Sequence, residues 1–565
     1  MTQLHAQPDV TLSAPPAARR PAVPMRRHLL VAACFALLAM SFQVHRTGWR
    51  GAAEAAEGDL GNIAAFAAGH DHPEYFVADN VLGDGRNFHW YATAHVPLAR
   101  WLRPLAGSYA GALLAGYGLH IFAHLLGFYL LGIVLFGSVL WSVVLALVAL
   151  APVSAGIVYD GWGLFDDPLP RLTFSALTGF LMAAAIKWRQ TPKAWPVLML
   201  AAGCGAYVHP VSAPAVGLML YLGLWAHRPR GWSLPGWIAR MAGLGVLFLL
   251  PAVPFALKYA TGRQDAPSAA DPMLQEIYRY FFVPQVWNVP YAMKLVVKAM
   301  FREGTAVLGI VGAILLLRAG KWRQGPLRPF VPWLVGIALV GMAMPLADYF
   351  RAVRRGAVCM QVDLERNVRF FVPILLTLFV WGLAELDRRA NGRAVWAKVG
   401  LLVATAWFAA HGGVSILMRP AAAVEVLRTG KPADIRLAQR AQAVAAVREL
   451  TPAGARVLPW NFPSTPIRHA ALRPVVHARQ DASCLIFSKR ELAMAWYERQ
   501  RMYDEIDRLP KGPERLQAIV YWGRQNGAQY LLIDEPHRPG EPLSARATSI
   551  WSNEQYSLLR LSDAE

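Results

Sequence analysis

The chain has 565 residues, of which 55% are hydrophobic and only 16% are charged. This composition is too apolar for a disordered chain and too poor in charge for an ordinary soluble enzyme. Lys and Arg number 56 against 36 Asp and Glu, which gives a formal net charge of +20. Because the basic residues lie between long apolar runs, they indicate a membrane protein and argue against nucleic acid as a partner.

Eleven apolar segments predict an α-helical polytopic membrane protein with about 11 transmembrane helices, since a bilayer core of roughly 30 Å needs about 20 apolar residues. The first segment is either a membrane anchor or the apolar part of a signal peptide, and the anchor is preferred. The pair 195–208 and 211–226 is either a hairpin or one helix kinked at His209-Pro210. The segments are 29–43, 109–136, 138–158, 172–186, 195–208, 211–226, 241–258, 304–317, 329–347, 370–386 and 399–418.

Basic residues mark the N-terminal tail, residues 1–28, and every second loop. Positively charged loops stay in the cytoplasm. The pattern therefore predicts a cytoplasmic N-terminus and, with an odd number of spans, an external C-terminus. The basic loop residues are Lys187, Arg189, Lys193, Arg228, Arg230, Arg240, Arg318, Lys321, Arg323, Arg328, Arg388, Arg389, Arg393 and Lys398.

The transmembrane domain, residues 29–418, is expected to carry four extracytoplasmic loops, at 44–108, 159–171, 259–303 and 348–369. The third of these is typical of an amphipathic interfacial helix pair. Residues 419–565 predict a small extracytoplasmic α/β domain. Its expected helices are 434–450, 489–507 and 513–526, and its expected strands are 456–459, 474–478, 530–533 and 556–561.

The first external loop contains a dense group of acidic and aromatic residues, including Asp71, Glu74 and Asp79. A carboxylate that is partly desolvated at the membrane surface has a raised pKa and is suited to act as a general base. Asp79 is the first choice, because it follows the aromatic-apolar stretch 75–78. The alternative is a solvated loop whose Asp and Asn residues make turns.

Two further loops offer candidate substrate ligands. Asp166 and Asp167 either cap the next helix or orient a substrate and hold a cation, and Arg171 is either an interfacial anchor or a phosphate ligand. Arg366 and Arg369 lie in an external loop where arginine is normally depleted, and their planar guanidiniums match phosphate oxygens. His209, at the outer end of a span, is either a packed residue or a ligand.

The layout resembles the GT-C superfamily of integral-membrane glycosyltransferases. The resemblance rests on the basic N-terminus, the long first external loop, the many spans and the terminal domain. Within that domain, 451–457 (TPAGARV), 527–534 (GAQYLLID) and 553–561 (NEQYSLLRL) look like the terminal domains of bacterial members. The family's hallmark is an acidic residue, often paired, in the first loop close after the first span. No adjacent acidic pair occurs in this loop.

The resemblance implies transfer of a sugar from a polyprenyl-phosphate donor to a glycan, lipid or protein acceptor on the extracytoplasmic side of a bacterial inner membrane. Asp79, Asp71 or Glu74 would be the base, and Arg366, Arg369 or Arg171 would stabilise the departing phosphate. Asp166 or Asp167 would orient the acceptor or hold a divalent cation. This cation, Mg²⁺ or Mn²⁺, is the only cofactor that the resemblance suggests.

Two other classes of function stay open at this point. A transporter or flippase for an anionic lipid or polysaccharide precursor would use the same external arginines, but it needs polar residues along the interior of several spans. A non-catalytic envelope assembly protein would use the terminal domain to bind another protein.

Overall fold

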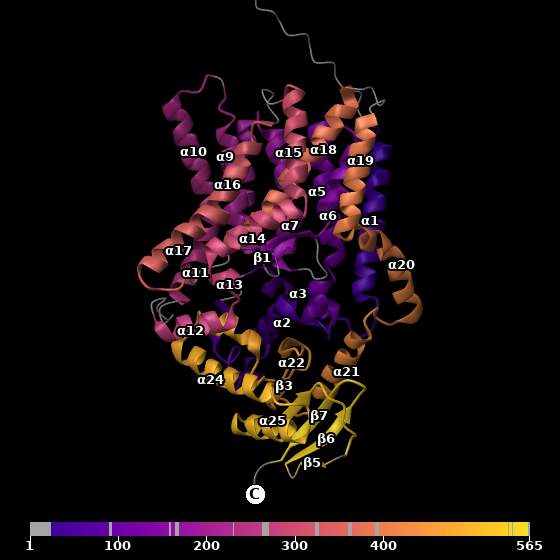
Figure 1. The fold of residues 1–565 in the computed structure, drawn as a ribbon, viewed down its shortest axis with the longest axis vertical. Coiled ribbons are helices and arrows are strands. Elements are labelled where there is room, and N and C mark those ends of the chain that lie inside the picture. The colour runs from indigo at the N-terminus through magenta and orange to yellow at the C-terminus, as the bar shows by residue number, and fades with distance from the viewer. Residues whose placement is uncertain are drawn as a thin grey trace, which may run out of the picture.

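The computed structural model describes residues 24–89, 93–157, 160–163, 169–229, 231–262, 271–321, 327–359, 364–389, 395–540, 542–544 and 546–562. The described chain is mostly helical, with a long bundle at one end and a small terminal sheet at the other (Figure 1). The helices are α1 (Met25–Thr47), α2 (Gly58–Asp71), α3 (His95–Ala106), α4 (Tyr109–Leu114), α5 (Tyr117–Phe136), α6 (Val139–Leu150), α7 (Pro170–Trp188), α8 (Trp195–Cys204), α9 (Ala213–Trp225), α10 (Leu234–Leu249), α11 (Val253–Gly262), α12 (Pro272–Phe281), α13 (Pro284–Trp287), α14 (Val289–Arg302), α15 (Thr305–Arg318), α16 (Phe330–Ala338), α17 (Met344–Arg354), α18 (Phe371–Arg389), α19 (Val395–Phe408), α20 (Val414–Thr429), α21 (Ile435–Leu450), α22 (Ser464–His469), α23 (Ala482–Leu485), α24 (Arg490–Asp507) and α25 (Pro513–Gln525).

Six helical stretches of the described chain are long and apolar enough to cross a membrane, or seven if the pair α14–α15, bent by 63°, is one span. A membrane protein is therefore supported, but the predicted count of eleven spans is not. Helices α6 and α9 are apolar but shorter than a bilayer core requires. The six stretches are Met25–Thr47, Tyr109–Phe136, Leu234–Leu257, Phe330–Arg354, Leu364–Arg389 and Val395–Thr429.

The segment 138–158 shows why the count differs. Helix α6 ends at Leu150, and strands β1 (Val153–Ile157) and β2 (Asp160–Trp162) follow as an antiparallel pair. Pro152 explains this stop, because the residue before a proline is driven out of the helical region. Ala151 accordingly has an extended ψ of 132°. The apolar composition of 138–158 predicted one span, but the backbone forms a short helix and then reverses direction in the β1–β2 hairpin.

The segment 195–226 is a hairpin. Trp195, at the start of α8, and Trp225, at the end of α9, both pack edge-on against Trp237 of α10. Helices α8 and α9 therefore run antiparallel, and the turn containing His209-Pro210 lies at their far end. This arrangement decides between the two interpretations that the sequence left open.

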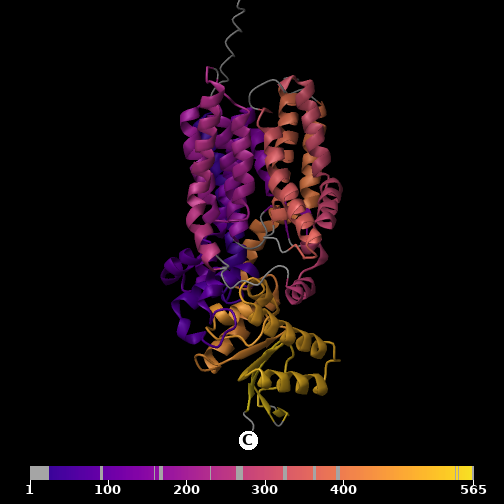
Figure 2. The ribbon, with the colours of Figure 1, turned by 90° about the vertical axis from the view of Figure 1, so that its left-hand side faces the viewer.

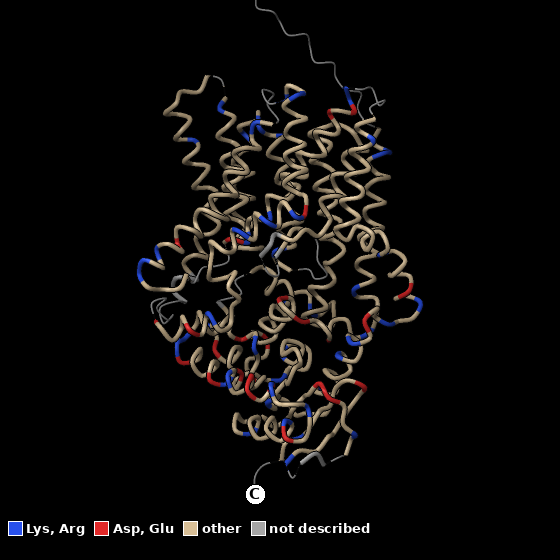
Figure 3. The backbone as a smooth tube through the Cα atoms, in the orientation of Figure 1, with Lys and Arg blue, Asp and Glu red and all other residues tan. Residues whose placement is uncertain are grey.

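The two ends of the bundle differ in what they carry. At the end where α1 begins, which we call the basic end, Lys321 lies 3.8 Å from Glu385 and Arg388 pairs with the same carboxylate. The opposite end, which we call the docking end, bears the first loop and the terminal domain (Figures 1 and 2). Figure 3 shows that Asp and Glu are concentrated beyond the docking end. Helices α12 to α14 lie in the segment predicted as an interfacial helix pair, whose residues 263–270 are outside the described part, and its interfacial position stays a prediction.

The terminal domain has a five-stranded sheet of order β3-β4-β7-β6-β5, in which β3 and β4 are parallel and the other neighbours antiparallel. The predicted small α/β domain is confirmed, and three of its four predicted strands are present. The fourth, 474–478, forms only an isolated bridge between Val475 and Val457. The strands are β3 (Val457–Trp460), β4 (Tyr530–Ile533), β5 (Pro542–Ser544), β6 (Ala547–Ser552) and β7 (Ser557–Leu561).

The terminal domain is fixed to the first loop by a buried ion-pair group. The guanidinium of Arg468 donates to both oxygens of Asp79 at 2.8 and 3.0 Å and to both oxygens of Asp481 at 2.6 and 2.9 Å. All three residues are at most 4% exposed. Nearby, α2 and α22 approach so closely that a Cβ added to Gly61 would lie 2.4 Å from the Thr465 hydroxyl oxygen. Glycine at 61 is therefore required by packing.

Replacement of Arg468 by methionine is expected to cost about 3–5 kcal/mol, because it leaves two carboxylates buried without their cation. The measurement is the midpoint of thermal unfolding of the purified protein in detergent. Changing Asp79 and Asp481 to asparagine in the same variant should restore part of the loss, since it removes the uncompensated charges.

The matched control is Arg436→Met, which breaks a similar two-pronged pair with Asp434 at an exposed position. Exposed pairs contribute little, so this variant should unfold close to the wild type. Equal losses in R468M and R436M would contradict the docking role of Arg468.

Candidate functional site

Three arginines and a histidine gather at the docking end of the bundle. Arg171 is the second residue of α7, His209 lies in the α8–α9 turn, and Arg366 and Arg369 lie in the 3₁₀ segment Leu364–Phe370 that leads into α18. The positive charges of Arg369, Arg171 and Arg366 all act on the His209 ring. The structure thus brings together the four basic ligands that the sequence predicted in three separate loops. We call them, with their polar neighbours below, the cationic site.

A chain of hydrogen bonds holds the centre of the cationic site. Arg369 is 2% exposed and donates to the hydroxyl of Ser212 at 2.6 Å, and this hydroxyl lies 2.8 Å from Nδ1 of His209. The amide of Asn367 donates to the carbonyl of Val211 at 2.9 Å. Because both contacts reach the same turn, the segment before α18 and the α8–α9 turn form one rigid unit.

A second polar chain ties the first loop to this unit. Thr93 lies just before α3, and its hydroxyl donates to the Val208 carbonyl at 3.0 Å and meets Nδ1 of His95 at 2.9 Å. The other nitrogen of His95 lies 3.0 Å from the hydroxyl of Thr173, which in turn is 3.1 Å from Nε2 of His120. His95, Thr173 and Ser212 were not singled out from the sequence, because single polar residues at helix ends carry no pattern.

Burial and charge keep the histidines of the first loop and the turn neutral. Burial, followed by the guanidiniums of Arg369, Arg171 and Arg366, holds the pKa of His209 well below its usual range. Burial, followed by repulsion from His120, lowers the pKa of His95 to about 4. The fixed positive charge at neutral pH therefore comes from the arginines, and the histidines serve as hydrogen-bonding groups.

Asp59 is the carboxylate that faces the cationic site. It lies in the first turn of α2, and its Oδ2 is 3.5 Å from Nη1 of Arg171. Its side chain is 47% exposed, so it is accessible to a ligand. The positive end of the helix dipole stabilises an acid in this turn. The sequence signal was its position soon after the first span, which ends at Thr47.

The acids predicted from the sequence lie elsewhere. Asp79 is enclosed by Arg468 and by the backbone N–H groups of Val81, Leu82 and Val475, so its surroundings leave no room for a substrate. Asp79 was preferred as the base because it follows the aromatic-apolar stretch 75–78. This stretch leads the chain into the interface with the terminal domain, so the position of Asp79 does not fit that role. The side chain belongs to the docking contact.

Asp71 and Glu74 lie at the far end of α2 from Arg171. Asp59 and Asp71 are twelve residues apart on α2, a separation of about 18 Å along its axis. Asp71 accepts hydrogen bonds from Arg100 and Tyr109 at 2.6 and 3.0 Å, and Glu74 is exposed near His72. Neither approaches the Arg171 contact. Asp166 and Asp167 fall outside the described residues.

The donor set of the cationic site suits an anion and not a metal ion. No group of three His, Cys, Asp or Glu within the described ranges is placed to hold a metal. Guanidiniums and hydroxyls from several elements bind phosphate oxygens, which accept several hydrogen bonds at once.

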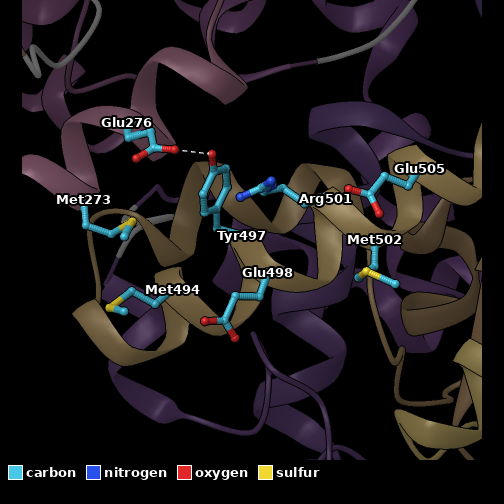
Figure 4. A pocket seen from close by; sticks show the side chains of 8 residues that line it. All are labelled: Met273, Glu276, Met494, Tyr497, Glu498, Arg501, Met502 and Glu505. Atoms are coloured by element: carbon cyan, nitrogen blue, oxygen red, sulfur yellow. Dashed lines mark hydrogen bonds between the residues drawn. The ribbon is translucent and has the colours of Figure 1, made fainter.

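A second concave feature has the opposite charge. A groove of about 450 Å³ lies between α12 and α24, where the Tyr497 hydroxyl donates to Glu276 at 2.7 Å (Figure 4). Three carboxylates and one guanidinium line it, so it disfavours a phosphate. The lining residues are Met273, Glu276, Met494, Tyr497, Glu498, Arg501, Met502 and Glu505.

No protein-family model matches the chain, and no curated protein matches it.

The neutral state of His95 predicts a pH dependence of stability. In the unfolded chain this histidine takes up a proton near pH 6.5, whereas in the folded chain it stays neutral down to about pH 4. The unfolded state then binds more protons in this window, so native stability falls as the pH falls through it. We expect His95→Gln to lose less stability than the wild type between pH 7 and pH 4.5, as measured by thermal unfolding midpoints.

Thr173→Val is the control, because it removes a hydrogen-bond partner of His95 without removing a titratable group. It should lower the midpoint at both pH values and keep the dependence on pH. If H95Q loses as much stability as the wild type on acidification, the neutral state of His95 is not responsible.

Proposed function

We propose that the protein is a membrane glycosyltransferase of GT-C type that transfers a sugar from a polyprenyl-phosphate donor to an acceptor at the docking end of the bundle. The observation that carries the proposal is the convergence of Arg171, Arg366 and Arg369 around one histidine. An acid, Asp59, stands beside these cations at the end of a membrane bundle.

The cations are suited to the phosphate of a lipid-linked donor. Arg369 is held by Ser212 and is almost fully buried, so its orientation is fixed before a ligand arrives. Preorganised charge of this kind stabilises an anion without a cost of reorganisation. A phosphate attached to a membrane lipid is delivered at the height of a bundle end, where these arginines lie.

Asp59 is the proposed general base. In the proposed step the acceptor hydroxyl attacks the anomeric carbon, its proton passes to Asp59, and the bond from that carbon to the phosphate oxygen breaks with inversion. The bonding electrons leave with the lipid phosphate, whose growing charge faces the arginines. Neither a redox partner nor a nucleophilic side chain is needed.

The proposed location is the inner membrane of a bacterium. The basic residues at the end where α1 begins favour a cytoplasmic position for that end. The docking end, with the first loop and terminal domain, is then periplasmic. The terminal domain is proposed to select the acceptor, since it is tied to the loop that carries Asp59.

The distribution of buried charge favours surface chemistry over transport. Among the described residues of the bundle, the fully buried charged side chains are Glu385 at the basic end and Glu365 and Arg369 at the docking end. A carrier that moves an anionic headgroup between these ends is expected to use charged side chains along its path. The assembly hypothesis is an outcome of the test below.

The test uses a deletion strain complemented with variants, scored by the mass-spectrometric profile of envelope glycans, together with binding of polyprenyl phosphate to purified protein. Asp59→Asn is expected to slow transfer by about 10²- to 10⁴-fold, because the acceptor proton loses its base. It should leave binding of polyprenyl phosphate in place. Arg366→Gln combined with Arg369→Gln is expected to weaken that binding.

Asp434→Asn is the matched control, because Asp434 is also an acid at a helix N-terminus beside an arginine, but lies far from the cationic site on exposed α21. It should transfer normally. If Asp71→Asn and not D59N abolishes transfer, the base is misassigned. If all variants keep a normal glycan profile while the deletion strain loses it, the protein acts as an assembly partner and the proposal is wrong.

A further inference from the structure

Helix α3 of the first loop presents a continuous apolar stripe that stays exposed among the described residues. Leu98, Trp101 and Leu105 are 43%, 76% and 86% exposed, and Pro97 and Pro104 complete the same face. At 100° per residue, these five positions fall within about a third of the helix circumference. A stripe of this kind outside the membrane-spanning helices requires an explanation.

Both ends of α3 are attached to the ends of bundle helices. At its start, the N–H of Ala94 donates to the carbonyl of Tyr207, in the outer turn of the α8–α9 hairpin. At its end, Gly107 turns with a φ of 75°, and Ser108 caps α4, where the apolar stretch Tyr109–Phe136 begins. A helix tied between two such points lies across the docking end of the bundle.

The other faces of α3 are polar or packed. His95, Val96 and Ala99 are buried, with His95 in the cationic site. Arg100 donates to Asp71 at 2.6 Å, and Arg103 donates to the Tyr109 hydroxyl at 2.9 Å. The guanidiniums thus flank the stripe without crossing it, which is the distribution of an interfacial amphipathic helix.

We propose that the stripe of α3 is immersed in the outer-facing leaflet of the bilayer and anchors the first loop at a fixed depth. Lipid is the occupant that fits, because the stripe continues directly into the apolar span that begins at Tyr109, and because a tryptophan between leucines suits the interface between acyl chains and headgroups. The inference requires only that the apolar helices span a bilayer, and it does not depend on glycosyl transfer.

The anchor has a consequence for the cationic site. His95 is the first residue of α3 and is bonded to Thr173 beside Arg171. Immersion of Leu98, Trp101 and Leu105 therefore places the cationic site at the level of lipid headgroups, where a lipid-linked phosphate lies. In this arrangement α3 sets the depth of the cationic site relative to the bilayer.

The experiment labels single cysteines with an environment-sensitive fluorophore in the full-length protein, reconstituted in nanodiscs with and without brominated acyl chains. The background carries Cys34→Ser and Cys204→Ser, since these two native thiols are exposed in the protein. Leu105→Cys and Trp101→Cys test the stripe. Leu119→Cys, 67% exposed on α5, is the lipid-facing control, and Tyr521→Cys, 57% exposed on α25, is the aqueous control.

Labels at 105 and 101 are expected to lose fluorescence to bromine as the label at 119 does, and to be shielded from iodide in water. The label at 521 should show the reverse. Iodide quenching of the stripe labels equal to that at 521 would overturn the proposal. Shielding from both quenchers would overturn it too, in favour of a protein partner. All four positions are exposed, so the substitutions leave the core intact.

Discussion

The position of the first loop depends on one guanidinium buried between two carboxylates. Arg468 lies 389 residues after Asp79, yet the two form a two-pronged pair in the protein interior. Burying three charges has a high desolvation cost, which only near-ideal geometry offsets. Removal of one partner leaves the remaining charges buried without compensation. The terminal domain is consequently a structural support for the loop between α1 and α3. Through the contact of Gly61 with Thr465, the same support reaches α2, which carries Asp59.

The arginines of the docking end and those of the basic end have different physical origins. At the basic end Lys321 and Arg388 pair with Glu385, as expected for residues that remain on one side of a membrane during insertion. At the docking end Arg369 is buried and hydrogen-bonded, so insertion topology does not account for it. Under the proposed function, Arg369 is kept there to bind the phosphate of the donor. The departure of the loop 348–369 from the charge rule is therefore the most informative feature of the sequence.

The sequence predicted features that depend on local pattern or on residue chemistry. Helical spacing of apolar residues predicted the terminal helix 434–450, short apolar runs predicted the strands at 530–533 and 556–561, and the chemistry of arginine singled out Arg366 and Arg369. Features set by packing between distant segments were not predictable. Nothing near Asp79 in the chain shows that Arg468 will reach it. Asp59 sits in a stretch of glycine and alanine soon after the first span, and the three-dimensional contact with Arg171 is what singles it out among the acids of the loop. Similarly, the apolar run through α6 gave no sign of the hairpin that follows Pro152.

The charge balance at the cationic site agrees with the direction of the proposed reaction. A sugar joined to a polyprenyl phosphate carries one negative charge on its phosphodiester, and the departing phosphate carries nearly two. Three guanidiniums, partly offset by Asp59 and by Glu365 in the sequence next to Arg366, favour the more negative species. Because the added charge of the proposed reaction develops as the bond to the anomeric carbon breaks, the arginines would stabilise its transition state more than the bound donor. His209 and His95 strengthen this bias by remaining neutral. Neutral histidines do not repel the arginines. Charged histidines would bind the donor as additional cations and would stabilise the ground state along with the transition state.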